Sequence, residues 1–262
     1  MRKLPIKLLI DADVYAYKAA SAVEKNITFD GDNFIRCTSL SEAQGVFEET
    51  LLHLREKFGN AGYILAFTDG ENFRKTLLPS YKAHRKVSDR PVVLEALKEQ
   101  LMEEHPFYVR DGLEADDVLG ILSTSTKIFP DHRRIIVSVD KDMKSIPGEF
   151  YDSKEDRLHT ITKEAAEYWH CMQTLMGDST DGYSGCPGIG PVKAEKILEE
   201  EVHGGYEKLW PLVVETFEKA KLTEEDALLQ ARMARILQVN NYDFKKKEVK
   251  LWEPPKTTKP PK

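Results

Sequence analysis

Acidic residues stand at the ends of three short apolar runs in this chain. Asp11 ends KLLID, Asp69 ends ILAFTD and Asp140 ends IIVSVD. Apolar runs of this length, separated by helical patterns, predict buried parallel strands, and open α/β sheets place their sites at the carboxyl ends of such strands. We therefore expect these carboxylates to converge at one edge of a sheet.

More acids follow nearby, in GLEADDVLG, beside Asp140 and in MGDSTDGYSG. The candidate metal ligands are Asp11, Asp69, Glu114, Asp116, Asp117, Asp140, Asp142, Asp178 and Asp181. Two unit charges about 5 Å apart repel by on the order of 3 kcal/mol at an effective dielectric near 20, so such a cluster needs cations. Oxygen ligands suit Mg²⁺ or Mn²⁺, and a pair of these ions supports phosphodiester hydrolysis.

Each acid also has a purely structural interpretation. An aspartate after a strand often caps a helix or forms a turn, and Asp116 and Asp117 could simply favour a helix N-terminus. The occurrence of all nine acids in these positions favours one shared site over nine separate helix caps or turns. His53, His84 and His170 lie in helical or basic surroundings, and we do not expect them to bind metal.

A basic segment follows Asp69. Residues 74–90 hold six Lys or Arg residues and one acid, although the chain as a whole has a net charge of −6. The segment predicts phosphate contacts, or alternatively a solvated charged face. Lys82 and Arg85, three residues apart, would share one helix face, and Tyr81 would either stack on a base or pack internally. The candidate DNA contacts here are Arg74, Lys75, Tyr81 and Lys86.

A glycine hairpin follows the last acids. Gly188 and Gly190 predict a tight turn before a helix that starts at Pro191. Exposed amides at such a turn bind phosphate, assisted by Lys193 and Lys196, or the hairpin is merely structural.

These residues must be positioned by an α/β domain. We expect a helix over residues 41–58, a second strand over 63–68, a helix starting at Pro91, a further helix from Asp116 and a third strand over 134–139. Beyond residue 160 the pattern predicts helices without strands, over residues 163–176, 191–201 and 223–239. Residues 253–262 are rich in Pro and Lys and predict a disordered tail.

Length and composition favour a soluble, self-sufficient protein. At 262 residues and 41% apolar content the chain can bury a core, and we expect a monomer. Cys37, Cys171 and Cys186 are widely spaced, which disfavours disulfides and zinc sites and favours a reducing compartment. Without a signal-like or membrane-spanning run, we expect a cytoplasmic location.

Taken together, the motifs resemble the 5′ nuclease superfamily of flap endonucleases, and most closely the 5′→3′ exonucleases of short-tailed bacteriophages. The resemblance covers nearly the whole chain, through AFTDGENFRK with PSYKAHRK, LEADDVLG, SVDKDMKSIP, GDSTDGYSG and LTEEDALLQARMARIL. It implies a PIN-like parallel sheet domain over residues 1–160 with a helical arch over 72–105. A helix–three-turn–helix region over 161–252 would bind duplex DNA.

The resemblance also implies roles for single residues. Those matching Asp11, Asp69, Glu114 and Asp116 serve a first metal, and Asp117 lies between the metals. Those matching Asp140, Asp142, Asp178 and Asp181 surround a second. Lys82 and Arg85 draw in the scissile phosphate, and the glycine hairpin contacts the uncut strand, with a K⁺ ion. Asp13 stands where many cellular members carry an amide, so its role is left open.

The implied activity is Mg²⁺-dependent removal of nucleotides from 5′ ends of duplex DNA, with flap and RNA–DNA primer cleavage, by a free-standing nuclease in the cytoplasm of a phage-infected bacterial cell. Two rival hypotheses are kept. Asp11-Ala-Asp13 and GDSTD also suit a haloacid-dehalogenase-like phosphatase with Asp11 as nucleophile. The basic segment and hairpin also suit a DNA-binding protein without catalysis.

Overall fold

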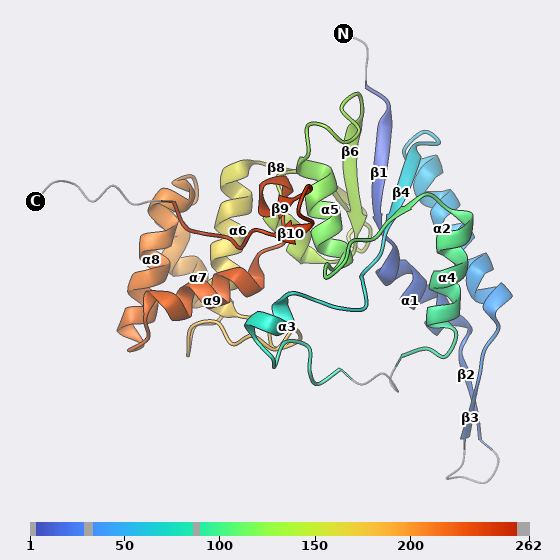
Figure 1. Cartoon of the computed structure of the whole chain (residues 1–262), viewed down its shortest axis with the longest axis horizontal. Coiled ribbons are helices and arrows are strands. Elements are labelled where there is room, and N and C mark those ends of the chain that lie inside the picture. Colours follow the sequence, from blue (N-terminus) through green and yellow to red (C-terminus); the bar gives the residue numbers. More distant parts are fainter. Residues whose placement is uncertain (1–3, 29–33, 86–89, 256–262) are drawn as a thin grey trace, which may run out of the picture.

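The structure, a computed structural model, describes residues 4–28, 34–85 and 90–255. A central sheet with helices on both faces lies beside a helical region formed by the C-terminal third of the chain (Figure 1). The predicted α/β class with a mainly parallel sheet is therefore confirmed.

The sheet contains six strands in the order β5-β4-β1-β6-β7-β8. All neighbours run parallel except β8, which pairs antiparallel with β7. The strands are β1 (Ile6–Asp11), β4 (Gly62–Ala66), β5 (Phe107–Tyr108), β6 (Arg133–Ser138), β7 (Gly148–Asp152) and β8 (Arg157–Ile161). Because β1 lies between β4 and β6, the three predicted strands are neighbours and their carboxyl ends meet at one edge.

Both faces of the sheet are covered, as its continuous apolar strands require. Leu8 and Ile10 pack on one face against α1 (Ala12–Val23), α2 (Leu40–Lys57) and α4 (Leu94–Glu104). Leu9, between them, belongs to the core on the other face, beneath α5 (Ala115–Thr124). This alternation along β1 fixes which residues reach the core and leaves Asp11 at the strand's end.

The C-terminal region contains four α-helices among the described residues, around a core that includes Trp210, Phe217 and Trp252. They are α6 (Lys163–Met176), α7 (Pro191–Leu198), α8 (Gly205–Lys219) and α9 (Glu224–Ala234), with a 3₁₀ turn, η3 (Glu199–Glu201), after α7. α6 matches its prediction, and α9 begins where predicted, with the Thr223 hydroxyl accepting the Asp226 amide. α8 was not predicted, because its initial glycines and internal Pro211 indicate a break.

Two small hairpins complete the structure. β2 (Lys25–Thr28) pairs with β3 (Phe34–Cys37), and β9 (Tyr242–Asp243) pairs with β10 (Glu248–Val249). The expectation of no strand beyond residue 160 is wrong. The strands are too short to show an alternating pattern, and buried Tyr242 anchors their hairpin on the α5 side of the sheet. The end of the predicted 161–252 region thus returns to the sheet domain.

The basic segment does not form the expected helix around Lys82 and Arg85. Its helical part is one short turn, α3 (Arg74–Leu77), and the chain then runs through turns to Arg85. Lys82 has a left-handed backbone, with φ of 52°, and its N–H donates to the carbonyl oxygen of Asp181 at 2.8 Å. This contact across the chain replaces a helical hydrogen bond. Lys86 lies outside the described residues, as does the predicted tail beyond residue 255.

In the part of the chain that the structure describes, the helices are too short or too polar to span a membrane. Cys37, Cys171 and Cys186 are free thiols, as expected, and the last two are buried.

Candidate metal centre and nucleic-acid interface

A first acidic group, defined here as Asp11, Asp116 and Asp140, gathers at the carboxyl ends of β1 and β6 and the start of α5. Asp11 caps α1, where its carboxylate accepts the Val14 amide at 3.4 Å and the Ser138 hydroxyl at 2.7 Å. Ser138 ends β6 and also accepts the amide of Asp140 at 3.1 Å. Two adjacent parallel strands therefore bring these acids together.

The electrostatics of the first acidic group favour a bound cation. Burial, together with the charges of Asp13 and Asp140, raises the pKa of Asp11 to about 7. Burial, then Asp11 and Asp140, also raise the pKa of Asp116 well above its ordinary value. The group thus holds more negative charge than its surroundings neutralise.

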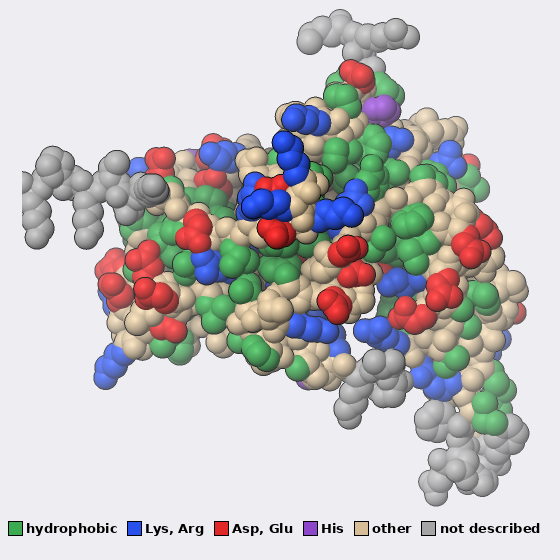
Figure 2. Space-filling model, viewed as in Figure 1, with side chains coloured by type: hydrophobic (Ala, Val, Ile, Leu, Met, Phe, Trp, Pro, Cys, Tyr) green, Lys and Arg blue, Asp and Glu red, His purple; other side chains and the backbone are tan. Residues whose placement is uncertain are grey.

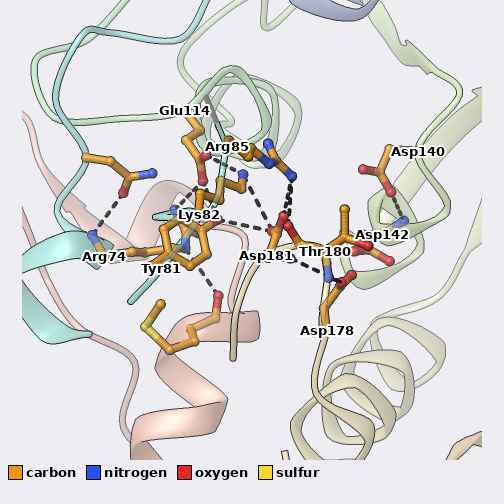
Figure 3. A network of polar contacts seen from close by, with 12 residues as sticks. Arg74, Tyr81, Lys82, Arg85, Glu114, Asp140, Asp142, Asp178, Thr180 and Asp181 are labelled. Atoms are coloured by element: carbon orange, nitrogen blue, oxygen red, sulfur yellow. Dashed lines mark hydrogen bonds and ion pairs between the residues drawn. The ribbon is translucent and has the colours of Figure 1, made fainter. Parts of the chain in front are cut away.

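A second acidic group, defined as Asp142, Asp178 and Asp181, continues from the first (Figure 3). Asp142 lies in a 3₁₀ turn, η2 (Lys141–Ser145), that Asp140 caps by accepting the Asp142 amide at 2.8 Å. Asp178 shapes the next turn by accepting the amides of Thr180 and Asp181. Burial and the neighbouring acids raise the pKa of Asp142 to about 6.

Two cations of the basic segment reach these acids. Lys82 Nζ lies 2.5 Å from Glu114 Oε1 and 3.5 Å from Asp181 Oδ2, while Arg85 Nη2 lies 2.7 Å from Asp181 Oδ1. Figure 3 shows Asp181 between these cations and the other acids of its group. Although burial opposes it, the charges of Arg74 and Lys82 hold the pKa of Glu114 down at about 2. Cationic and acidic side chains thus share one site, a suitable arrangement for phosphate and metal together.

Arg74 and Asp117 correct two predictions. Arg74 is 3% exposed, and its guanidinium donates to both oxygens of Asp117, at 2.6 and 2.8 Å. Asp117 is fully buried and also accepts the amides of Glu114 and Leu237. Asp117 therefore has no free oxygen for a position between metals, and Arg74 is not available to DNA. A carboxylate as deeply buried as that of Asp117 requires a buried cationic partner, and sequence reasoning did not pair it with Arg74.

Tyr81 is 2% exposed, and its hydroxyl donates to Glu114 Oε2 at 2.8 Å. The structure therefore supports internal packing of Tyr81, and the alternative prediction that its ring stacks on a base is wrong. Lys75 is exposed, so the structure leaves it free to contact DNA.

The side chain of Asp69 contacts backbone amides of nearby loops rather than either acidic group. Its Oδ2 accepts the amide of Gly112 at 2.8 Å, which fastens the loop before α5 and lowers the pKa of Asp69. Asp13 instead accepts the Thr68 amide at 2.8 Å and pairs with Lys98 at 2.8 Å. Lys98, which pairs with Asp13, and Ser138, which holds Asp11 and Asp140, were not identified from the sequence. Ser138 lies two residues before Asp140.

The fit to metal ions can be tested on ligand geometry. Among the described residues, two sets of three potential ligand atoms lie within 4.8 Å of one another: Glu48, Glu104 and His105, and Asp152, Glu155 and His159. Neither set contains a predicted ligand, so the predicted carboxylates are more widely spaced. Asp142 Oδ1 is nevertheless buried without a hydrogen-bond partner, and Lys141 Nζ lies 3.6 Å from it. A buried, unsatisfied carboxylate oxygen fits a hard cation.

The glycine hairpin has the predicted form. Gly188 has a left-handed backbone, with φ of 75°, and Gly190 precedes the first turn of α7 with Pro191. A Cβ at either glycine would meet nothing within 4 Å, so the surface beside both is open. Lys193 Nζ donates to the carbonyl oxygen of Gly188 at 2.8 Å, which places its charge over the hairpin.

Comparison with known families gives a match over most of the chain. Residues 7–167 match the family described as "5'-3' exonuclease, N-terminal resolvase-like domain". The chain is 34% identical to the "Exonuclease" of Escherichia phage T7, with 94% of this chain and 93% of that protein covered. It is also 34% identical to the "Exodeoxyribonuclease" of Enterobacteria phage T3, with 94% and 92% covered.

Solved structures support the same fold. A structure described as divalent metal ions (zinc) bound to T5 5′-exonuclease superposes with a TM-score of 0.62 at 17% identity, and 89% of each chain is covered. At this identity the similarity concerns the arrangement of the elements.

Proposed function

The chain belongs to the 5′-3′ exonuclease family, and from this membership we propose that it hydrolyses DNA from 5′ ends with divalent metal ions. It is a hydrolase, a nuclease of the exonuclease and flap-nuclease type. We further propose that it accepts 5′ flaps and RNA–DNA hybrids, acts as a monomer, and works in the cytoplasm of a phage-infected bacterial cell. The observation that carries the proposal is the meeting of two acidic groups with Lys82 and Arg85 at Asp181.

The two acidic groups would hold Mg²⁺ or Mn²⁺. Such ions supply an activated water and neutralise the oxygens that enter and leave the phosphorus. Asp11, Asp116 and Asp140 would hold one ion, and Asp142, Asp178 and Asp181 the other. The raised pKa values of Asp11, Asp116 and Asp142 support this assignment, because a cation relieves the repulsion among neighbouring carboxylates.

The cationic side chains would position the substrate. Lys82 and Arg85 contact acids of the site and would attract the scissile phosphate to the same place. The backbone amides of Gly188 and Gly190, with Lys193, would hold a phosphate of the uncut strand, with K⁺ at the hairpin as part of the proposal. Cleavage at the 3′ oxygen would leave a 5′-phosphate.

The phosphatase alternative is less well supported. It would use Asp11 as nucleophile, yet the Asp11 carboxylate is buried and engaged by Ser138. The family match favours the nuclease.

The experiment uses a 3′-labelled duplex with a 5′ end, a 5′-flapped duplex and an RNA–DNA hybrid, each with MgCl₂ or EDTA. We expect cleavage in MgCl₂ and none in EDTA, and the duplex should be shortened stepwise from its 5′ end. Asp140→Asn should lose this activity. Asp131→Asn, the same change at an exposed aspartate before β6, should keep it. Equal cleavage by both variants would contradict the assignment of the acids.

A further inference from the structure

A second basic surface lies on the β9–β10 hairpin, a part of the chain that the proposed site does not use. The basic-aromatic face, as we name it, consists of Arg110, Phe244, Lys245, Lys246 and Lys247. Figure 2 shows Lys and Arg side chains gathered over α5 and this hairpin, close to a group of acids. The three lysines are exposed, in a chain whose net charge is −6.

The turn of the hairpin is built to present these lysines. Asp243 Oδ1 accepts the amides of Lys245 and Lys246 at 3.0 and 3.2 Å, and its other oxygen pairs with Lys250 at 3.3 Å. Lys247 has a left-handed backbone, with φ of 57°, which closes the turn. The backbone geometry therefore presents three adjacent, exposed lysines on one turn.

Aromatic rings adjoin the charges. The Phe244 side chain is 46% exposed and stands edge-on against buried Tyr242, with ring centroids 5.2 Å apart. The Arg110 guanidinium lies over the Tyr108 ring at 4.9 Å from its centroid. Tyr108, Arg110, Tyr242 and Phe244 line one shallow recess against α5. An exposed aromatic ring beside clustered lysines is the combination that binds unpaired bases and their phosphates.

The recess lies close to the candidate site. Ile121, which lines it, is five residues along α5 from Asp116, or roughly 8 Å at the rise of an α-helix. Arg110 lies in the loop before α5, which the Asp69 carboxylate holds at Gly112, and Glu114 and Asp116 follow in the same segment. The basic-aromatic face and Asp116 therefore both adjoin α5.

We propose that the basic-aromatic face binds single-stranded nucleic acid. This inference rests on the proposed function, because digestion of one strand from its 5′ end leaves the opposite strand unpaired. Bases in a duplex are stacked inside and offer no face to Phe244, whereas an unpaired strand offers both bases and phosphates. The face would thus retain the enzyme on partly digested DNA.

The test compares four purified proteins: the wild type, a face variant, a control variant and Phe244→Ala alone. The face variant carries Phe244→Ala, Lys245→Gln, Lys246→Gln and Lys247→Asn, since asparagine tolerates the left-handed backbone. The control carries Lys154→Gln, Lys163→Gln and Lys221→Asn, which remove three exposed lysines elsewhere, one of them also left-handed. Binding of blunt and 3′-overhanging duplexes is measured by fluorescence anisotropy, with CaCl₂ in place of MgCl₂, over a series of salt concentrations.

The wild type and the control should bind the overhanging duplex more tightly than the blunt one. The face variant should bind it at least about tenfold more weakly, from the lost stacking alone. The slope of log affinity against log salt concentration should become less steep by about 2. The face variant loses three lysines, and each phosphate contact on a single strand contributes about 0.7 to this slope. Phe244→Ala alone should lose affinity with an unchanged salt dependence.

Equal affinity and salt dependence of the face variant and the wild type would overturn the proposal. Loss of binding to an acidic peptide, with oligonucleotide binding unchanged, would also overturn it and identify a protein partner instead. Because binding is measured without cleavage, a wild type that binds overhangs but never cuts DNA would refute the proposed function and leave this inference standing.

Discussion

At the scale of single residues, the site keeps charges of both signs in contact. Lys82 bridges Glu114 and Asp181, and Arg85 holds the other oxygen of Asp181. Such contacts preorganise the side chains before the substrate arrives, and a phosphate can then share the cations. Burial, assisted by neighbouring acids, raises the pKa of Asp181 all the same, although its two cations oppose the rise.

Lys82 provides the first prediction. Lys82→Gln should lower the single-turnover rate of 5′ cleavage by about 10²–10³-fold at saturating MgCl₂, a typical loss when one preorganised charge is removed. Lys57→Gln, which removes a lysine paired with exposed Asp156 elsewhere, is the control. A rate for Lys82→Gln within twofold of the wild-type rate would contradict the role of Lys82.

Asp142 gives a prediction in which stability and activity change in opposite directions. Its pKa of about 6 exceeds the ordinary 3.8, so ionised Asp142 destabilises the folded state above pH 6. In EDTA at pH 8, Asp142→Asn should raise the free energy of unfolding, by up to roughly 3 kcal/mol. Cleavage, and the stabilisation by MgCl₂, should both decrease.

Urea unfolding with and without MgCl₂ measures this effect, with Asp131→Asn as the matched control. If Asp142→Asn proves less stable than the wild type in EDTA, repulsion at the second acidic group is not the dominant effect.

At the scale of elements, one buried ion pair ties together three separate parts of the chain. Arg74, from α3, binds Asp117 of α5 and donates to the carbonyl oxygens of Met233 and Arg235 at the end of α9. This contact explains why α9 ends at Ala234 rather than at the predicted residue 239, since Arg235 is extended. The basic segment is thus anchored where it enters the site.

The anchor predicts strong coupling between Arg74 and Asp117. Arg74→Met should reduce the free energy of unfolding by about 3–5 kcal/mol, because it leaves a buried carboxylate unpaired. Arg74→Met combined with Asp117→Leu should recover part of this loss. Denaturant unfolding of both single variants and the double variant gives the coupling free energy, and additive losses would show that the pair is not coupled.

At the scale of the whole molecule, the two regions respond to pH in opposite directions. His170, buried in the helical region, donates from Nε2 to the carbonyl oxygen of Ala231 and accepts from Tyr206 at Nδ1. Burial, then the charge of Arg235, lowers the pKa of His170 from 6.5 to about 3. In the sheet domain, the pKa values of Asp11 and Asp142 are raised instead.

These shifts predict two opposing contributions to stability in EDTA, whose pH ranges overlap between about pH 4 and 6.5. As pH falls from about 6.5 to 3, the unfolded state takes up a proton at His170 that the folded state refuses, so stability falls. As pH rises from about 4 to 7, the folded state must release protons that it binds more tightly at Asp11 and Asp142, so stability also falls. MgCl₂ should abolish the decline at higher pH and leave the acid side unchanged.

Urea unfolding from pH 3 to 9, with MgCl₂ or EDTA, measures both contributions, because the MgCl₂ series should show that of His170 alone. NMR of His170 should show a neutral ring down to about pH 4. A decline at higher pH that persists at saturating MgCl₂ would contradict cation binding by these acids.

Local sequence patterns were enough to place the central strands β1, β4 and β6 and most of the helices, and they predicted a site at the carboxyl ends of these strands. Buried parallel strands are continuous apolar runs, so Asp11 and Asp140 could be placed at the carboxyl ends of β1 and β6 from their positions alone. The bounds of α6 and the start of α9 followed from periodicity within each segment in the same way. Local patterns suffice wherever the cause of a structure lies within one segment.

Tertiary structure alone decided which acids are free and which are paired. Asp116 and Asp117 are neighbours with the same side chain, yet one lies among carboxylates and the other is neutralised by Arg74. Likewise, the contact of Lys82 with Asp181 overrides the helical spacing of the basic segment. Their partners lie far away along the chain, and burial and long-range ion pairing depend on the folded arrangement rather than on sequence spacing.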